Sequence, residues 1–149
     1  MTRIEVVDGA ATRELRRAVL RPTWPLGSAM HGDENPDAVH FAALDDSGRV
    51  IGTCLVLPRP YPPHPDRPAA WQLRGMATAP ELRDRGIGAE VLAAAVAEIR
   101  ARGGRLVWCD ARTTAVAFYA QHGFAAEGAE FLHAESGIPH YRMWRALPD

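Results

Sequence analysis

The strongest constraint on the fold is a short glycine-containing segment between a predicted strand and a predicted amphipathic helix. The strand spans residues 71–78, the helix spans residues 87–102, and residues 83–88 between them read RDRGIG. Glycine lacks a side chain and tolerates positive φ, so the backbone can come close to a ligand. The free N–H groups at a helix start favour an anion. The segment therefore predicts a loop that binds phosphate or pyrophosphate.

Three kinds of phosphate-binding loop have this general form. The Walker type ends in Gly-Lys-Ser/Thr, and this chain has no lysine, since all 17 of its Lys and Arg residues are arginine. A dinucleotide loop needs a small residue three positions after the second glycine, where this chain has Val91. The remaining pattern, R-x-x-G-x-G, is met by Arg83, Gly86 and Gly88. Taken alone, that pattern is equally compatible with a turn that has a solvated basic rim.

The composition is typical of one globular domain. A chain of 149 residues with 47% hydrophobic and 23% charged residues can bury a substantial core, so we expect a single domain over residues 1–149. The formal net charge of −1 predicts neither nucleic-acid nor membrane binding. No stretch has the length and apolarity of a membrane span and no signal peptide is evident, which favours the cytoplasm.

The cysteines, Cys54 and Cys109, each lie in an apolar run. This position predicts buried, reduced, structural thiols. No C-x-x-C or H-E-x-x-H spacing occurs, so the sequence predicts no metal site.

Hydrophobic periodicity predicts strands alternating with helices. Strands are expected at residues 4–7, 40–44, 50–57, 71–78, 106–109, 130–133 and 140–144, and helices at residues 11–20, 87–102 and 115–122. In the first helix, Thr12 is expected to be the N-cap, and Leu15, Ala18 and Val19 are expected to form the apolar face. Residues 22–37 and the proline-rich residues 58–68 are expected to be loops. A strand, a crossover helix and a second strand predict a parallel pair within an α/β fold.

A second motif gives the chain a specific family resemblance. Residues 115–124 read AVAFYAQHGF and resemble the A-x-x-F-Y-x-x-x-G-F segment of the GNAT N-acetyltransferases. Residues 73–88 resemble the strand and pyrophosphate loop of the same family, and the two motifs occur in the family's order. Residues 130–143 are similar to the ending of a small bacterial branch with a GIPH-x-x-M segment.

The resemblance implies a fold, a reaction and a cofactor site. The fold would be the GNAT acyl-CoA N-acyltransferase fold, with a central, mostly antiparallel mixed sheet, a parallel splayed pair and flanking helices. The reaction would be acetyl transfer from acetyl-CoA to a primary amine of a small molecule or peptide, by direct attack on the thioester. The residues implied in acetyl-CoA binding are Met76, Ala77, Thr78, Arg83, Asp84, Arg85, Gly86, Ile87, Gly88, Ala89, Ala115 and Phe118.

One position departs from the family pattern. Many members have asparagine three residues before the alanine of the second motif, where this chain has Arg112. Arg112 either reaches a phosphate of CoA or is a solvated surface residue, and the sequence does not decide between these two alternatives.

Tyr119 is the best catalytic candidate. A phenol has a pKa of about 10 and a thiol of about 8.5, so a protonated tyrosine can donate to the thiolate that leaves the thioester. The alternative is that Tyr119 only packs beside Phe118. The general base is open: a water chain could serve, and the candidate side chains are His31, Asp33, Glu34, His133, Glu135 and His140.

The acceptor and the assembly are less constrained. Asp33, Glu34 and Asp37 make the loop at residues 22–37 acidic, which would suit a cationic amine but is also typical of an ordinary solvated loop. The alternative to an enzyme is a non-catalytic acetyl-CoA or CoA sensor, or a partner-binding module. A homodimer is possible from the resemblance alone.

Overall fold

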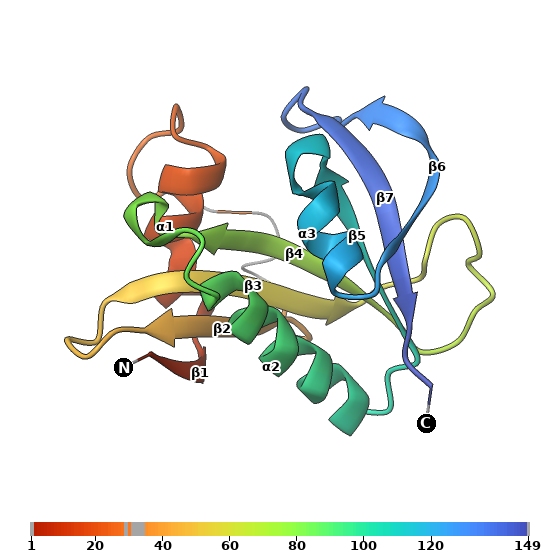
Figure 1. Ribbon diagram of the computed structural model, residues 1–149, viewed down its shortest axis with the longest axis horizontal. Coiled ribbons are helices and arrows are strands. Elements are labelled where there is room, and N and C mark those ends of the chain that lie inside the picture. Colours follow the sequence, from red (N-terminus) through yellow and green to blue (C-terminus); the bar gives the residue numbers. More distant parts are fainter. Residues whose placement is uncertain (1, 29, 31–34, 149) are drawn as a thin grey trace. The chain divides into compact units, whose positions relative to one another are not determined.

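The computed structural model describes residues 2–28, 30 and 35–148, which form a mixed seven-stranded sheet with helices. The strands follow the order β1-β2-β3-β4-β5-β7-β6 (Figure 1). Their bounds are β1 Arg3–Val7, β2 Val39–Leu44, β3 Val50–Pro58, β4 Ala70–Thr78, β5 Leu106–Arg112, β6 Ala125–Leu132 and β7 Pro139–Ala146. The helices are α1 Gly9–Leu20, α2 Ile87–Ala101 and α3 Val116–Gln121, with short 3-10 turns η1 Pro80–Leu82 and η2 Thr113–Ala115. None of these helices combines the length and the apolar character needed to cross a membrane.

The chain divides into two compact units. The first contains Met1–Pro58 and Leu73–Glu98, and the second contains Arg59–Gln72 and Ile99–Asp149. Strand β4 therefore begins in the second unit and ends in the first. The mixed sheet and the order of the elements confirm the predicted α/β fold class.

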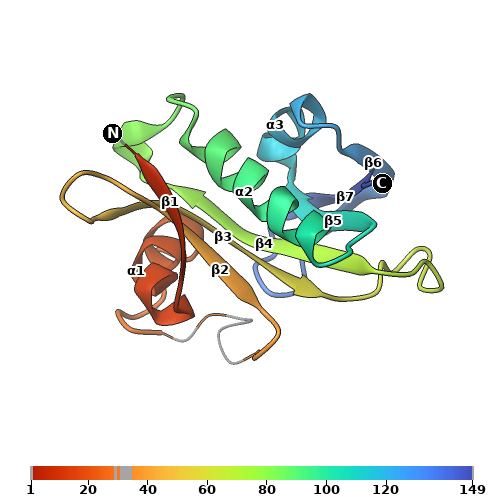
Figure 2. The same cartoon turned by 90° about the horizontal axis from the view of Figure 1, so that it is seen from below.

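The first unit is a sheet covered on both faces. Strands β1 and β2 pair antiparallel, as do β2 and β3, and α1 and α2 lie on opposite sides of these strands (Figure 2). Every residue of β2 is buried, and β3 is buried over residues 51–57, because a strand between two layers has no face toward water. A tight turn joins β2 to β3, since Gly48 N–H donates to the Asp45 carbonyl at 3.0 Å.

Helix α1 corrects two sequence predictions. Its N-cap is Asp8, whose carboxylate accepts from Ala10 N–H at 3.1 Å, and Thr12 lies inside the helix. The fully buried face is not the apolar one: it holds Gly9, Thr12 and Arg16, whereas Ala18 is exposed. Burial of Arg16 is tolerated because its polar groups are hydrogen-bonded: Nε donates to Thr12 Oγ1 at 3.0 Å and Nη2 donates to the Gly9 carbonyl at 3.3 Å.

Helix α2 follows the sequence prediction closely. Its apolar stripe consists of residues that are all buried: Ile87, Val91, Leu92, Ala95 and Ile99. The helix ends at glycines: Gly103 adopts a φ of 82° and Gly104 N–H donates back to the Ile99 carbonyl at 2.8 Å.

The second unit holds the parallel pair. Ala70, Trp71 and Gln72 of β4 pair in parallel with Leu106, Val107 and Trp108 of β5. Strand β7 pairs antiparallel with β5 on one side and with β6 on the other. Strand β6 begins at Ala125, five residues before the predicted start, because Gly128 at φ 85° and a register shift interrupt its pattern without ending the strand.

The proline-rich loop, residues 59–69, is tied to this second sheet. Tyr61 is fully buried, and its hydroxyl donates to Glu127 Oε1 of β6 at 2.9 Å. His64 Nε2 lies 3.2 Å from the other oxygen of the same carboxylate. The indole N–H of Trp108 donates to the Arg59 carbonyl at 3.1 Å. The loop is therefore held by side chains rather than by regular structure.

Candidate functional site

A backbone irregularity precedes the residues predicted to bind the cofactor on β4. Gly75 has a φ of 65° in the middle of the strand, a conformation that L-residues with side chains adopt only under strain. Such a residue re-aims the strand that follows it. The residues that follow are Met76, Ala77 and Thr78, of which Ala77 is buried and the other two are half-buried.

A tight turn joins β4 to α2. Ala79 N–H donates to the Ile51 carbonyl at 2.9 Å and so fixes the end of β4 against β3. The η1 turn follows, and then Asp84 at φ 64° and Gly86 at φ 80° reverse the chain. Asp84 thus adopts a positive φ although it has a side chain.

The N-terminus of α2 offers an open set of donors. Gly86 accepts the first helical hydrogen bond, from Glu90 N–H at 3.1 Å, so the N–H groups of Ile87, Gly88 and Ala89 have no acceptor within the helix. A Cβ on Gly86 would have no heavy atom within 4 Å. The buried side chain of Ile87 lies against Gly52 of β3, which fixes the helix start on the sheet.

The arginines of this loop are exposed to solvent. Arg83, Asp84, Arg85 and Gly86 are all exposed. Within residues 2–28, 30 and 35–148, neither Arg83 nor Arg85 has a side-chain hydrogen bond or ion pair. An exposed positive loop over unsatisfied backbone N–H groups fits a phosphate or pyrophosphate group.

The second motif forms the segment after β5. Arg112 is half-buried at the end of β5, and Ala115 and Phe118 are also half-buried. A glycine turn ends α3: Phe124 N–H donates to the Tyr119 carbonyl at 3.1 Å, with Gly123 at φ 87°.

The Tyr119 ring is held between two aromatic neighbours. Its centroid lies 5.2 Å from that of Phe118 and 5.4 Å from that of Phe124, both edge to face. Only 6% of Tyr119 is exposed. The packing predicted beside Phe118 is therefore present, and it fixes the ring's orientation.

The candidate bases fall into two groups. His31, Asp33 and Glu34 lie outside the described residues. His133, Glu135 and His140 belong to the β6–β7 hairpin, where the two histidine rings stack with centroids 4.7 Å apart. Glu135 is exposed at the turn, whereas His140 is buried.

The cysteines are structural, as predicted. Both are free and buried, and burial raises the pKa of the Cys54 and Cys109 thiols well above the ordinary value. A thiol in this state is a poor nucleophile. Among the described residues, no group of three or more His, Cys, Asp or Glu side chains could hold a metal ion.

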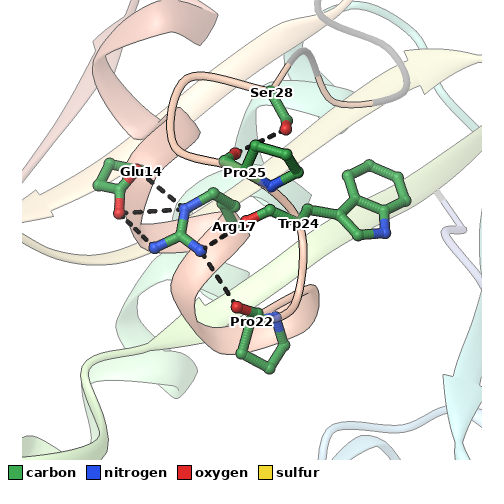
Figure 3. A network of polar contacts seen from close by, with 6 residues as sticks. All are labelled: Glu14, Arg17, Pro22, Trp24, Pro25 and Ser28. Carbon is green, nitrogen blue, oxygen red and sulfur yellow. Dashed lines mark hydrogen bonds and ion pairs between the residues drawn. The ribbon is translucent and has the colours of Figure 1, made fainter.

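The loop after α1 is anchored to that helix by one arginine (Figure 3). Arg17 Nη1 donates to the Trp24 carbonyl at 3.1 Å and to the Pro22 carbonyl at 3.4 Å, and Nη2 pairs with Glu14 at 2.6 Å. Ser28 then closes a turn on the Pro25 carbonyl at 2.6 Å. The first part of the loop predicted to border the acceptor is thus ordered by local contacts.

These features define a class of protein: a mixed sheet with a parallel pair, a positive glycine loop at a helix start, and a tyrosine-bearing short helix after the next strand. The family model described as "Acetyltransferase (GNAT) family" matches residues 10–124. The chain belongs to this family and is an N-acetyltransferase.

Relatives and solved structures agree with this assignment. An uncharacterized N-acetyltransferase of Bacillus subtilis, YitI, is 25% identical over 131 residues, covering 88% of this chain and 87% of that protein. A provisionally assigned N-acetyltransferase from Lactobacillus plantarum has a crystal structure with a TM-score of 0.79, at 19% identity and 99% coverage of both chains. An aminoglycoside 6'-N-acetyltransferase crystallised with coenzyme A gives a TM-score of 0.73, at 19% identity and coverage of 99% of this chain and 98% of that one. At these identities the structural likenesses establish the fold.

Proposed function

We propose that the protein transfers an acetyl group from acetyl-CoA to a primary amine of a small molecule or peptide. The observation that carries the proposal is the loop at residues 83–89. It combines exposed arginines, a positive-φ glycine open to solvent, and helix-start N–H groups without helical acceptors. A solved structure of the same fold contains coenzyme A, which supports an acyl-CoA as the donor.

The loop and the end of β4 are the proposed cofactor side. Backbone N–H groups of residues 86–89 would hold the pyrophosphate, and Arg83 and Arg85 would add charge. The backbone of Met76, Ala77 and Thr78 would hold the pantetheine and the thioester carbonyl. Arg112, Ala115 and Phe118 complete the proposed cofactor residues.

Tyr119 is the proposed acid. The amine nitrogen attacks the thioester carbon and loses one proton to solvent or a base, the C–S bond breaks, and the phenol donates its proton to the departing sulfur. Tyr119 then recovers a proton from solvent. Phe118 and Phe124 fix the ring on two sides, so the hydroxyl needs little reorganisation to donate.

The acceptor is proposed by chemical class only. Aminoglycosides are one class, because a structure of the same fold belongs to an aminoglycoside 6'-N-acetyltransferase. We further propose that residues 1–149 act as one catalytic domain, that the protein is cytoplasmic, and that it acts alone or as a homodimer, without nucleic acid or membrane.

Calorimetry with acetyl-CoA and CoA, followed by thiol release with kanamycin, spermidine, amino acids and a tripeptide with a free N-terminus, tests the proposal. Micromolar acetyl-CoA binding with release for at least one amine is expected. Binding without release would favour the alternative of a non-catalytic CoA-binding sensor or partner module. No binding of either nucleotide would overturn both functions.

A further inference from the structure

His140 is held in one hydrogen-bonded orientation at the start of β7. Its Nδ1 lies 2.7 Å from the Ile138 carbonyl oxygen. A carbonyl can only accept a hydrogen bond, so Nδ1 must carry the hydrogen. In the neutral ring the lone pair is then on Nε2. Since only 6% of His140 is exposed, this tautomer is set by the protein rather than by water.

Two rings fix the plane of the imidazole. The centroid of His133 lies 4.7 Å from that of His140 at an interplanar angle of 36°, and the centroid of Phe131 lies 6.1 Å away at 31°. Strand register places Phe131 directly across from His140. The turn that carries His133 is closed by its N–H, which donates to the Ile138 carbonyl at 3.0 Å. The same carbonyl therefore closes the turn and orients the ring.

The position of His140 in the sheet connects it to the second motif. In the antiparallel pair of β5 and β7, His140 lies opposite Arg112. Arg112 is the last residue before the segment that carries Tyr119. Thr113 donates to Glu130 of β6 at 2.8 Å, so the η2 turn is attached to the same hairpin. His140 thus lies beside the carboxyl end of β5, which belongs to the parallel pair, and ligands bind at the carboxyl ends of parallel strands.

The charged side chains around His140 are engaged with other groups. Asp110 and Arg142, which share its face of the sheet by strand alternation, pair with each other at 2.9 Å. Arg142 also lies over the Phe131 ring at 5.5 Å. Glu130 accepts from Thr113, Arg112 faces His140 by register, and the ring of His133 packs on that of His140.

We propose that His140 Nε2 accepts the proton that the amine loses during acetyl transfer, directly or across one water molecule. The role rests on the proposed function. The amine N–H bond breaks as the nitrogen bonds to the acetyl carbon, the proton moves to Nε2, and the imidazolium returns it to solvent. The Ile138 carbonyl keeps its hydrogen bond in both charge states, so no reorientation is needed.

Paired substitutions test the role of His140. In His140→Asn the amide N–H can still donate to the Ile138 carbonyl, but the base is lost. We expect kcat to fall at least about 100-fold at pH 7, with KM for acetyl-CoA within about twofold. The loss of kcat in His140→Asn should become smaller as pH approaches the pKa of the amine, because the amine is then deprotonated without a protein base. His64→Asn is the matched control, with the same substitution on a histidine of the proline-rich loop, and should keep the wild-type kcat.

The outcomes separate the role of His140 from the proposed function. Wild-type turnover of kanamycin, spermidine or the tripeptide, together with an unchanged kcat and pH profile in His140→Asn, would overturn the role alone. No wild-type turnover of any amine would overturn the proposed function and this role with it. Nitrogen-resolved NMR of the histidine rings gives a second readout that needs no acceptor. It should find neutral His140 with its hydrogen on Nδ1, and a hydrogen on Nε2 would overturn the assignment.

Discussion

The side chain of Arg16 fills the space that a side chain on Gly75 would need. Its Cδ lies 3.0 Å from the position of a Cβ added to Gly75, and Leu55 Cδ2 lies 3.4 Å from the same point. Arg16 is only 1% exposed, so its aliphatic stem packs as part of the core while its guanidinium bonds to α1. Helix α1 thus packs against Gly75, the positive-φ residue of β4 that directly precedes Met76.

Gly75→Ala should therefore destabilise the fold more than an alanine at an open glycine. Gly48→Ala is the matched control, because Gly48 also has positive φ, at 86°, but has nothing within 4 Å of an added Cβ. Both variants carry the backbone cost of about 1–2 kcal/mol, and only Gly75→Ala overpacks the core, at a further cost of about 1–3 kcal/mol. Urea unfolding measures both, and equal losses would contradict the contact.

Gly86→Ala should weaken acetyl-CoA binding without a comparable loss of stability. Gly27→Ala is its control, since the two glycines have φ values of 80° and 79° and neither has a heavy atom within 4 Å of an added Cβ. The backbone strain that alanine introduces is therefore the same in both variants, but only Gly86 lies at the start of α2. We expect the Kd for acetyl-CoA to rise at least about tenfold, or 1.4 kcal/mol, in Gly86→Ala. In Gly27→Ala it should stay within about twofold, and calorimetry that finds equal Kd values would remove Gly86 from the cofactor site.

The sequence predicted best where a local rule decides the structure. The stripe of α2 and its glycine end follow from helix periodicity and from the φ that only glycine adopts easily. The turn from Gly123 to Phe124 follows from the same rule. These local elements carry the loop at residues 83–88 and Tyr119, so the candidate cofactor residues could be named before the fold was known.

The sequence failed where tertiary contacts override local preference. Thr12 and Arg16 look like solvent-facing helix residues, and only the packing of α1 on β2–β4 buries them. The sequence also could not select His140 among the candidate bases. The Ile138 carbonyl orients the His140 ring, and no sequence rule predicts the direction of that carbonyl in its turn. The burial of Tyr61 was not predicted, because residues 58–68 were predicted only to be a proline-rich loop.

Tyr119→Phe should lower kcat while acetyl-CoA binds normally. The phenylalanine keeps the edge-to-face packing on Phe118 and Phe124 and removes only the proton donor, whose contribution as a general acid is about 100-fold or more. Tyr61→Phe, another buried tyrosine, is the control and should keep the wild-type kcat. Steady-state kinetics with any amine that releases thiol, together with calorimetry for acetyl-CoA, measure the two quantities. An unchanged kcat in Tyr119→Phe would exclude the phenol as the donor.

The Tyr61–Glu127 hydrogen bond should make stability depend on alkaline pH. Burial raises the pKa of Tyr61 well above its usual value, and the hydrogen bond to Glu127 and that carboxylate's charge raise it further. A raised pKa in the folded state means that the contribution is complete below the unfolded pKa of about 10 and is lost progressively as pH rises from that value through the higher folded pKa. Tyr61→Phe should cost about 1 kcal/mol at pH 7 through the lost hydrogen bond.

The difference between wild type and Tyr61→Phe is the quantity to follow, because Cys54 and Cys109 are also buried and their raised pKa values lower the stability of both proteins equally in alkali. Urea unfolding from pH 7 to pH 11 should give a constant advantage of the wild type up to about pH 9 and a shrinking one above about pH 10, where the unfolded phenol ionises. Glu127→Gln should shift this decline to higher pH only slightly or not at all, since burial is the largest cause of the raised pKa. A wild-type advantage that stays constant to pH 11 would show that Tyr61 ionises as easily in the folded protein as in the unfolded chain.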